Sequence, residues 1–66
     1  MHPATEAILK FFSYDHLPIR LQTISRPFSD LANQMAILLD GPELTVCLRK
    51  LLEAKDCAVR ASLADE

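Results

Sequence analysis

The spacing of apolar residues between positions 17 and 38 limits the possible folds of this chain more than any other feature. Steps of four and three residues separate them without interruption, which brings all of them to one side of an α-helix. The series consists of Leu17, Leu21, Ile24, Phe28, Leu31, Met35 and Leu38. It predicts a helix over residues 17–40 with an apolar seam of the coiled-coil type.

Pro27 lies inside this helix, although the spacing keeps one phase on both of its sides. Proline removes a backbone donor and clashes with the preceding turn, so we expect a kink near Pro27 or a restart of the helix capped by Ser25. The unbroken phase favours one bent helix over two independent ones. At the start of the helix, Asp15 can serve as the cap, and Pro18 suits the first turn.

A short amphipathic helix is expected before the seam, within residues 1–13. Pro3 suits its first turn, because a proline there loses no helical hydrogen bond. Its apolar positions, at helical spacing, are Ala7, Ile8, Phe11 and Phe12. The polar residues from Ser13 to His16 then predict a turn.

A third helix is expected over residues 42–64. Gly41 can adopt the left-handed conformation after a helix and Pro42 fits a first helical turn, so a tight connection between antiparallel helices is predicted. The third helix has a wide apolar stripe made of Leu44, Cys47, Leu48, Leu51, Leu52, Ala58 and Val59, with Ala54 and Ala61 at its margins. One partner helix cannot cover this stripe. The predicted fold is therefore a single all-α domain, a short N-terminal helix followed by an antiparallel helical hairpin, assembled as a homo-oligomer.

The composition limits the functions open to such a domain. Seven Lys or Arg and nine Asp or Glu among 66 residues give a net charge of −2, and half of the residues are hydrophobic. A core of this size rarely supplies more than about 3–5 kcal/mol, which favours self-association and excludes most enzymes. The acidic balance argues against binding to duplex nucleic acid. The longest uncharged run, residues 31–39, is too short for a membrane span.

The two cysteines, Cys47 and Cys57, lie about 15 Å apart along the third helix. A disulfide needs Cα atoms within about 7 Å, so these two cannot pair. Without a CxxC pair or a secretory leader, we expect buried, reduced thiols of a cytosolic protein. The other soft ligands, His2 and His16, lack zinc-ligand spacing, so no metal site and no cofactor are expected.

Charged residues gather on one face of the third helix. Two ion pairs at four-residue spacing are expected there, Arg49 with Glu53 and Asp56 with Arg60, as on an ordinary solvated face. Alternatively, several copies could bring Arg49, Lys50 or Arg60 around one symmetry axis. A multivalent anion would then relieve the repulsion between like charges.

The turn and the start of the second helix carry a ring, an imidazole and two guanidinium groups, namely Tyr14, His16, Arg20 and Arg26. Aromatic faces stack on bases, and guanidinium groups bind phosphates. The structural alternative is that Tyr14 packs over the hairpin with its hydroxyl in water, His16 is a turn residue and both arginines are solvated. No catalytic constellation accompanies them, because the carboxylates are scattered and Gly41 is the only glycine.

The order of several motifs resembles that of a known family. The motifs are Tyr14-Asp15-His16-Leu17-Pro18, Leu21-Gln22, Ser25-Arg26-Pro27-Phe28, Leu31-Ala32 and Leu48-Arg49-Lys50-Leu51-Leu52-Glu53-Ala54-Lys55-Asp56. Over residues 14–63 the chain resembles the phage-encoded anti-CBASS cyclic-oligonucleotide sponges, whose helical hairpin also occurs in anti-Thoeris sponges. The resemblance implies a homohexamer that binds cyclic dinucleotides between paired subunits and cyclic trinucleotides near the threefold axis.

The resemblance also implies roles for single residues in the dinucleotide pocket. Tyr14 would stack on a base and Arg26 would bind a phosphate, with His16 and Ser29 as their neighbours. Family members can have lysine in place of Arg26, which keeps the charge but changes the donor geometry. The candidates for the trinucleotide pocket follow from the symmetry argument and are Arg49, Lys50 and Arg60.

The function implied by the resemblance is sequestration of a signal without cleavage. It would block CBASS-type immune signalling in the cytoplasm of the infected bacterial host, with no enzyme activity. The alternative is a small helical oligomer that binds another protein through its apolar stripe. A phosphodiesterase is disfavoured, because the sequence offers no metal cluster and no general base.

Overall fold

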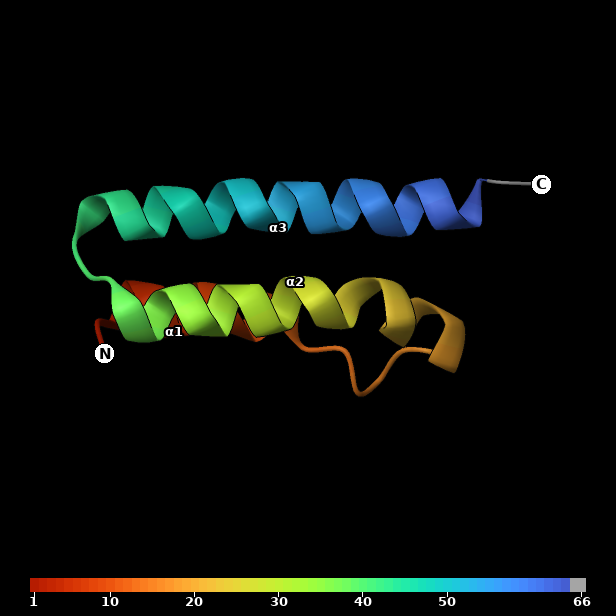
Figure 1. The fold of residues 1–66 in the computed structure, drawn as a ribbon, viewed down its shortest axis with the longest axis horizontal. Helices are drawn as coiled ribbons and strands as arrows, with labels where there is room; N and C mark the ends of the chain where they lie inside the picture. The colour runs from red at the N-terminus through yellow and green to blue at the C-terminus, as the bar shows by residue number, and fades with distance from the viewer. Residues whose placement is uncertain (65–66) are drawn as a thin grey trace.

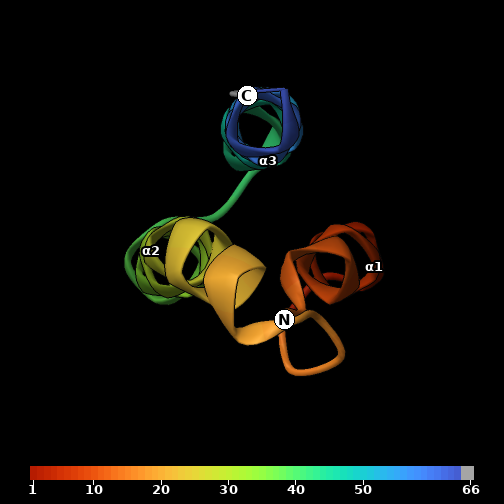
Figure 2. The same cartoon turned by 90° about the vertical axis from the view of Figure 1, so that its right-hand side faces the viewer.

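The computed structural model describes residues 1–64 and contains three α-helices in that range. Helix α1 spans Pro3–Leu9 and continues into a 3-10 turn, η1, at Lys10–Phe12; α2 spans Ile19–Leu38 and α3 spans Pro42–Leu63. Helices α2 and α3 lie side by side and run in opposite directions (Figure 1). Viewed along the helices, α1 lies against both of them (Figure 2). The all-α class is confirmed, and residues 65–66 of the predicted domain lie outside the described part.

The starts of the helices follow from local sequence, with two departures from prediction. Pro3 begins α1 in its first turn, as expected. The cap of α1 was not predicted: the His2 Nδ1 accepts the N–H of Ala4 at 3.0 Å. Helix α2 has Pro18 at its N-cap and no side-chain cap, so the predicted cap by Asp15 is wrong. Pro18 occupies the N-cap position, where its restricted φ directs the chain into the helix. Asp15, three residues earlier, is therefore not at the cap.

Gly41 forms the connection between α2 and α3 in a conformation open mainly to glycine. Its φ of +94° is positive, as expected, but its ψ of 176° is extended and not left-handed helical. Its carbonyl accepts the N–H of Leu44 at 3.1 Å, so Gly41 belongs to the start of α3. Helix α2 has already ended, where the N–H of Leu39 donates to the Met35 carbonyl at 2.9 Å.

The side of α2 that faces the rest of the protein carries small residues. Ser25, Ser29 and Ala32, spaced by four and three positions, are its buried residues. The predicted seam lies about a quarter turn further around the helix, given about 100° per residue. Its residues are mostly half-buried, and Leu31 and Leu38 are exposed. The seam therefore flanks the core, while small side chains let α2 approach its neighbours.

Helix α2 passes through Pro27 without interruption. Ser25 does not cap a second helix, since its Oγ has no hydrogen-bond partner. Of the two arrangements considered for this proline, the structure has the single helix.

The apolar core is small and lies toward the connection between α2 and α3. Its buried residues come from every helix and are Ile8, Phe12, Ala32, Leu44 and Leu48. The chain leaves the core after Phe12, so α1 covers only the half of the α2–α3 pair near the connection (Figure 1). Residues 13–18 run beside the other half.

Helix α3 departs from the predicted stripe at its cysteines. Cys47 and Cys57 are free but exposed, so their prediction as buried residues is wrong. Cys47 precedes the buried Leu48 by one position, which turns its side chain about 100° away from the core. Since α1 and α2 pack on one side of α3 only, the margins of the stripe stay uncovered.

The ion pairs also differ from those predicted. Within residues 1–64 they are Lys55 with Asp56 at 3.2 Å and Arg26 with Asp30 at 3.9 Å. The predicted Arg49–Glu53 and Asp56–Arg60 pairs are therefore not formed in this part of the chain. Asp56 pairs with its neighbour because the Lys55 side chain is held against the protein, with 14% of it exposed.

No helix within residues 1–64 is long and apolar enough to cross a membrane.

Candidate anion-binding cavity

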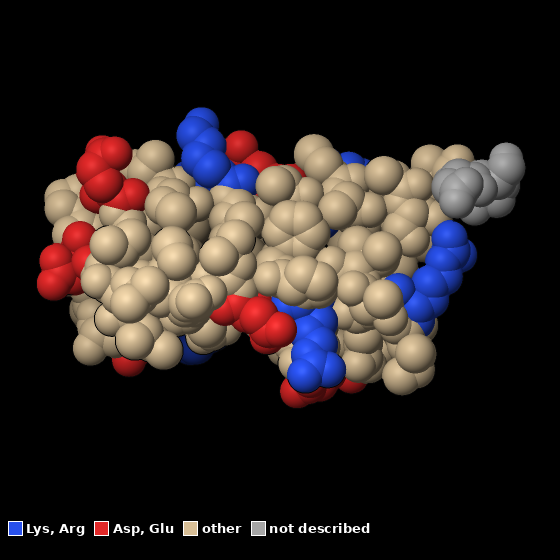
Figure 3. Space-filling model, in the orientation of Figure 1, with Lys and Arg blue, Asp and Glu red and all other residues tan. Residues whose placement is uncertain are grey.

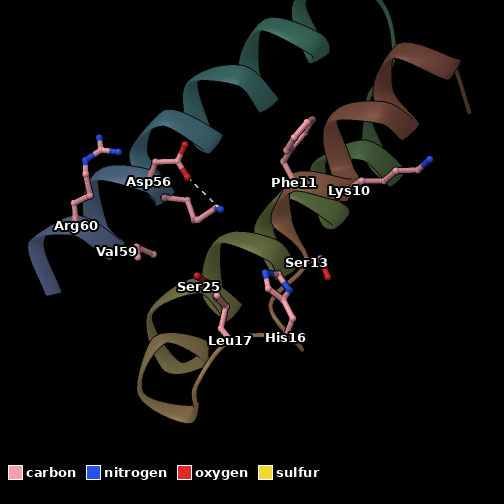
Figure 4. Close-up of a pocket in the computed structure, with 10 residues that line it drawn as sticks. Lys10, Phe11, Ser13, His16, Leu17, Ser25, Asp56, Val59 and Arg60 are labelled. Atoms are coloured by element: carbon pink, nitrogen blue, oxygen red, sulfur yellow. Dashed lines mark ion pairs between the residues drawn. The ribbon is translucent and has the colours of Figure 1, made fainter. Parts of the chain in front are cut away.

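A cavity of about 340 Å³ lies beyond the end of η1, between residues 13–18, α2 and α3 (Figure 4). It occurs where the core stops: Phe12 is buried, and the next residue, Ser13, already lines the cavity. Opposite, α2 contributes Ser25, whose side chain is too small to fill the space. The apolar part of the lining consists of Phe11, Leu17 and Val59.

Gln22 of α2 holds the 13–18 segment in place. Its Nε2 donates to the Leu17 carbonyl at 2.8 Å and to the Asp15 carbonyl at 3.4 Å. The N–H of Leu17 also donates to the Tyr14 carbonyl at 3.0 Å, which closes a turn. Backbone groups of this segment are thereby tied to α2, and the segment forms a defined wall of the cavity.

The charge of the lining is mostly positive. Lys10, Lys55 and Arg60 supply three cations, His16 adds a titratable imidazole, and Asp56 is the one carboxylate of the lining. This excess contrasts with the net charge of −2 of the whole chain. The side chains of Lys10 and Arg60 extend outward from the rim, whereas the His16 ring turns toward the space between the helices (Figure 4).

Ser25 has the most unusual environment in the cavity. The residue is 1% exposed, and its Oγ is the buried side-chain polar atom without a hydrogen-bond partner in residues 1–64. Leaving such a hydroxyl unpaired costs about 1–3 kcal/mol. Buried polar groups in folded proteins almost always have a protein, water or ligand partner, so this hydroxyl calls for a water molecule or a polar ligand in the cavity.

The residues predicted for the dinucleotide pocket occupy different places in the single chain. His16 lines the cavity, and Tyr14 is half-buried in the same segment. Arg26 lies outside the lining, one position after Ser25, with 65% of its side chain exposed. Ser29 is buried one turn further along α2, where its Oγ accepts the Asn33 amide at 3.4 Å. The structure thus brings Tyr14 and His16 together and leaves the other two on separate surfaces of α2.

The residues predicted for the trinucleotide pocket do not meet in one chain. Arg60 lines the cavity, and its Nη2 donates to the Cys57 Sγ at 3.4 Å. Arg49 borders a separate groove between α1 and α3, of about 310 Å³. Lys50 is exposed on α3. Any convergence of these three residues would require several copies of the chain.

Of the residues that line the cavity, His16 and Arg60 were predicted site residues, and the others, among them Ser25 and Lys55, were not. A signal for Lys55 was present in the sequence, because steps of four, three and four connect Leu44, Leu48, Leu51 and Lys55. A lysine at the core position of an apolar series buries its aliphatic stem against the protein. Ser25 has no such signal, since its burial follows from the small-residue side of α2.

The described residues hold no group of three or more His, Cys, Asp or Glu side chains that could bind a metal ion.

Comparison of the chain with family models, curated proteins and solved structures gave no match. The chemistry of the cavity therefore has to be judged from its own residues: two hydroxyls, an imidazole and an excess of cations complement an anion.

Proposed function

We propose that this chain binds and sequesters cyclic di- and trinucleotides without cleaving them, as a phage protein that blocks CBASS-type immune signalling in the cytoplasm of the bacterial host. The observation that carries the proposal is the cavity itself, whose lining includes three cations, Lys10, Lys55 and Arg60, and one carboxylate, Asp56. Of the motif Tyr14 to Pro18, which resembles the sponge family, His16 and Leu17 line this cavity. Tyr14 lies in the same segment and is half-buried.

The ligand would be held by stacking and by charge. The Tyr14 ring would stack on a base, since every base offers a face to an aromatic side chain. Arg26 would contact a phosphate: its pair with Asp30 is long, at 3.9 Å, and solvent-exposed, so it is worth about 0–1 kcal/mol and exchanges easily for a ligand. His16 lies beside Tyr14 as a further donor.

Cyclic rings of two or three nucleotides would be shared between copies of the chain. The cavity of about 340 Å³ is near the lower end of small-molecule pockets, which suits one nucleotide better than a whole ring. A symmetric ring placed between paired protomers would present one phosphate to each. Arg49, Lys50 and Arg60 would approach each other only near a higher symmetry axis, where they would serve the trinucleotide.

The surface supports self-association, for which we propose a homohexamer of helical hairpins. Large apolar residues are exposed on η1, on both long helices and at the connection, including Phe11, Ile19, Ile37, Leu38, Leu39 and Leu63. The face drawn in Figure 3 is mostly uncharged, with Lys and Arg in a few separate places and Asp and Glu in others. A domain with so small a core gains stability by covering such residues with further copies.

Sequestration needs binding and no chemical step. A binder lowers the free concentration of a messenger by mass action, so tight affinity or high abundance is sufficient. Ser25, the buried hydroxyl of the cavity, has no base bonded to it that would make it a nucleophile. The ring would therefore remain intact while it is bound.

The test is to incubate the purified protein with cyclic di- and trinucleotides, remove free ligand, digest the protein and chromatograph what is released. We expect intact cyclic nucleotide. Linear products would replace the proposal by a phosphodiesterase. No bound nucleotide at micromolar concentrations would favour the alternative, a helical oligomer that binds another protein through its exposed apolar residues.

Two variants test the assigned residues. Tyr14→Ala should remove dinucleotide binding in calorimetry while light scattering shows an unchanged oligomer. Arg26→Glu should act likewise, and Lys50→Glu, with the same change of charge at another exposed position, should retain dinucleotide binding. If Arg26→Glu instead dissociates the oligomer, Arg26 belongs to an interface between copies.

A further inference from the structure

We infer that Ser25 and Lys55 form a phosphate-binding subsite at the inner end of the cavity. The inference deepens the proposed function and rests on it for the class of ligand. It concerns two residues that neither the motifs nor the symmetry argument singled out.

The register of the two long helices places Ser25 opposite Lys55. Near one end of the pair, the Nη2 of Arg20 donates to the Ser62 carbonyl at 2.6 Å. Near the other end, Ala32 and Leu48 share the core. Antiparallel helices rise equally, by about 1.5 Å per residue, so position 25 faces the turn of α3 that contains positions 55 to 57. Both Ser25 and Lys55 line the cavity, in agreement with this register.

The two side chains have unused donors where water has little access. The Ser25 hydroxyl is buried without a partner, and it lies on the side of α2 that faces α3 (Figure 4). The Lys55 side chain is 14% exposed, and its ammonium group, which has three donors, forms an ion pair with Asp56 at 3.2 Å. A phosphate group offers only acceptors to such donors, and charge-assisted hydrogen bonds are about twice as strong as neutral ones.

Charge favours a phosphate over a water molecule as the occupant. A water could satisfy the Ser25 hydroxyl, but it carries no net charge to attract the Lys55 ammonium group, whose side chain is 14% exposed. A phosphate carries that charge, and the low polarity of the half-buried site strengthens the attraction. Asp56 can then pair with Arg60, four positions further on the same helix face. Lys55 would then contact the phosphate, and Arg60 would pair with the Asp56 carboxylate.

The experiment compares Lys55→Met with Lys55→Arg. Both changes alter the same half-buried side chain, but only Lys55→Met removes its positive charge. With cyclic di-AMP in calorimetry, Lys55→Met should weaken binding about tenfold or more, because bonds to a charged group are lost. Lys55→Arg should retain most of the affinity, because the charge and its donors remain. Circular dichroism verifies folding, and Lys55→Gln is the second variant if Lys55→Met does not fold.

Ser25→Ala separates a binding role from a structural one. Removal of an unpaired buried hydroxyl should leave the thermal midpoint of the free protein unchanged or higher, while the affinity falls about three- to tenfold. A hydroxyl that serves only the fold would give the opposite pattern, a lower midpoint with unchanged affinity, and this result would overturn the assignment of Ser25.

Binding of cyclic di-AMP by the unmodified protein and by Lys55→Met distinguishes failure of the subsite from failure of the proposed function. If the unmodified protein binds cyclic di-AMP and Lys55→Met binds it equally well, the subsite is refuted and the proposed function stands. If the unmodified protein does not bind it, the proposed function fails, and titration with AMP and inorganic phosphate by nuclear magnetic resonance decides the subsite. Saturable shifts at Ser25 and Lys55, absent from Lys55→Met, would support it; unchanged signals would refute it.

Discussion

Phe12 decides whether the N-terminal segment holds together with the two long helices, and Phe12→Ala tests this directly. Phe12 is 1% exposed and packs with residues of α1, α2 and α3, whereas its neighbour Phe11 is 65% exposed. Both residues are phenylalanines, and they are adjacent at the end of the same segment. Phe11→Ala is therefore a control that differs only in burial.

The expected magnitudes follow from this difference. A fully buried phenyl ring removes about 150–250 Å² from water, which at about 25 cal/mol per Å² corresponds to about 4–6 kcal/mol. This is an upper bound, and losses of about 3–5 kcal/mol are typical of Phe→Ala in a core. Phe11 buries about a third of its surface, so its loss should be about 1–2 kcal/mol. A chain of 66 residues has about 3–10 kcal/mol in total, so Phe12→Ala removes much of it.

The assay is urea denaturation followed by circular dichroism, at one protein concentration because self-association contributes to stability. Phe12→Ala should unfold at a much lower urea concentration than Phe11→Ala. Equal losses for both variants, or a loss below about 1 kcal/mol for Phe12→Ala, would refute the view that Phe12 anchors the segment. A loss for Phe11→Ala that exceeds its estimate and grows with protein concentration would assign Phe11 to an interface between copies.

Three further changes test the backbone of the fold. Pro27→Ala restores a missing donor inside α2, so it should raise the free energy of unfolding by about 1–3 kcal/mol and the thermal midpoint with it. A lower midpoint would mean that α2 needs this proline for its packing. Gly41→Ala should lower the free energy of unfolding by about 1–3 kcal/mol, because the φ at this position is positive, although an added Cβ meets nothing within 4 Å. Gly41→Asn should not restore the lost stability, because ψ of 176° lies outside the left-handed helical region. Full stability of either variant in thermal melts would contradict this reasoning. Arg20→Ala removes a 2.6 Å hydrogen bond to the Ser62 carbonyl and should speed amide exchange in the last turn of α3 without affecting Leu48, so uniform exchange rates would speak against a local effect.

The helices were predictable because each has a strong local signal. Apolar spacing and the prolines at first turns placed α1 and α3, since both signals depend only on neighbouring residues. The orientation of α2 was not predictable in this way. Ser25, considered as a helix cap, and Ser29, considered as a neighbour of a ligand, lie outside the apolar series, yet they are buried because their small size permits close packing. Which side of a helix faces the core depends on the partner helices, and one sequence segment does not contain that information.

The cavity was predictable only in part. His16 and Arg60 were singled out from residue type and position, and both line it. Lys55 was not singled out, although it continues the apolar series of α3. Its residue type suggests exposure, whereas the helical register decides its burial. The roles of Tyr14, Arg26 and Ser29 remain predictions, because they concern a ligand or a second copy of the chain.

Stability and binding are separated along the length of the α2–α3 pair. The core occupies the half near the connection, through residues such as Leu44 and Leu48, and the cavity occupies the other half. The cavity half gains little apolar burial, and it holds Lys55 and an unpaired hydroxyl, so in the free chain it lowers stability. A ligand that satisfies these groups binds only the folded state and raises stability by RT ln(1 + [L]/Kd). The same polar residues that weaken the single chain thus make its folding sensitive to an anion, and Phe12, at the boundary, connects the two halves.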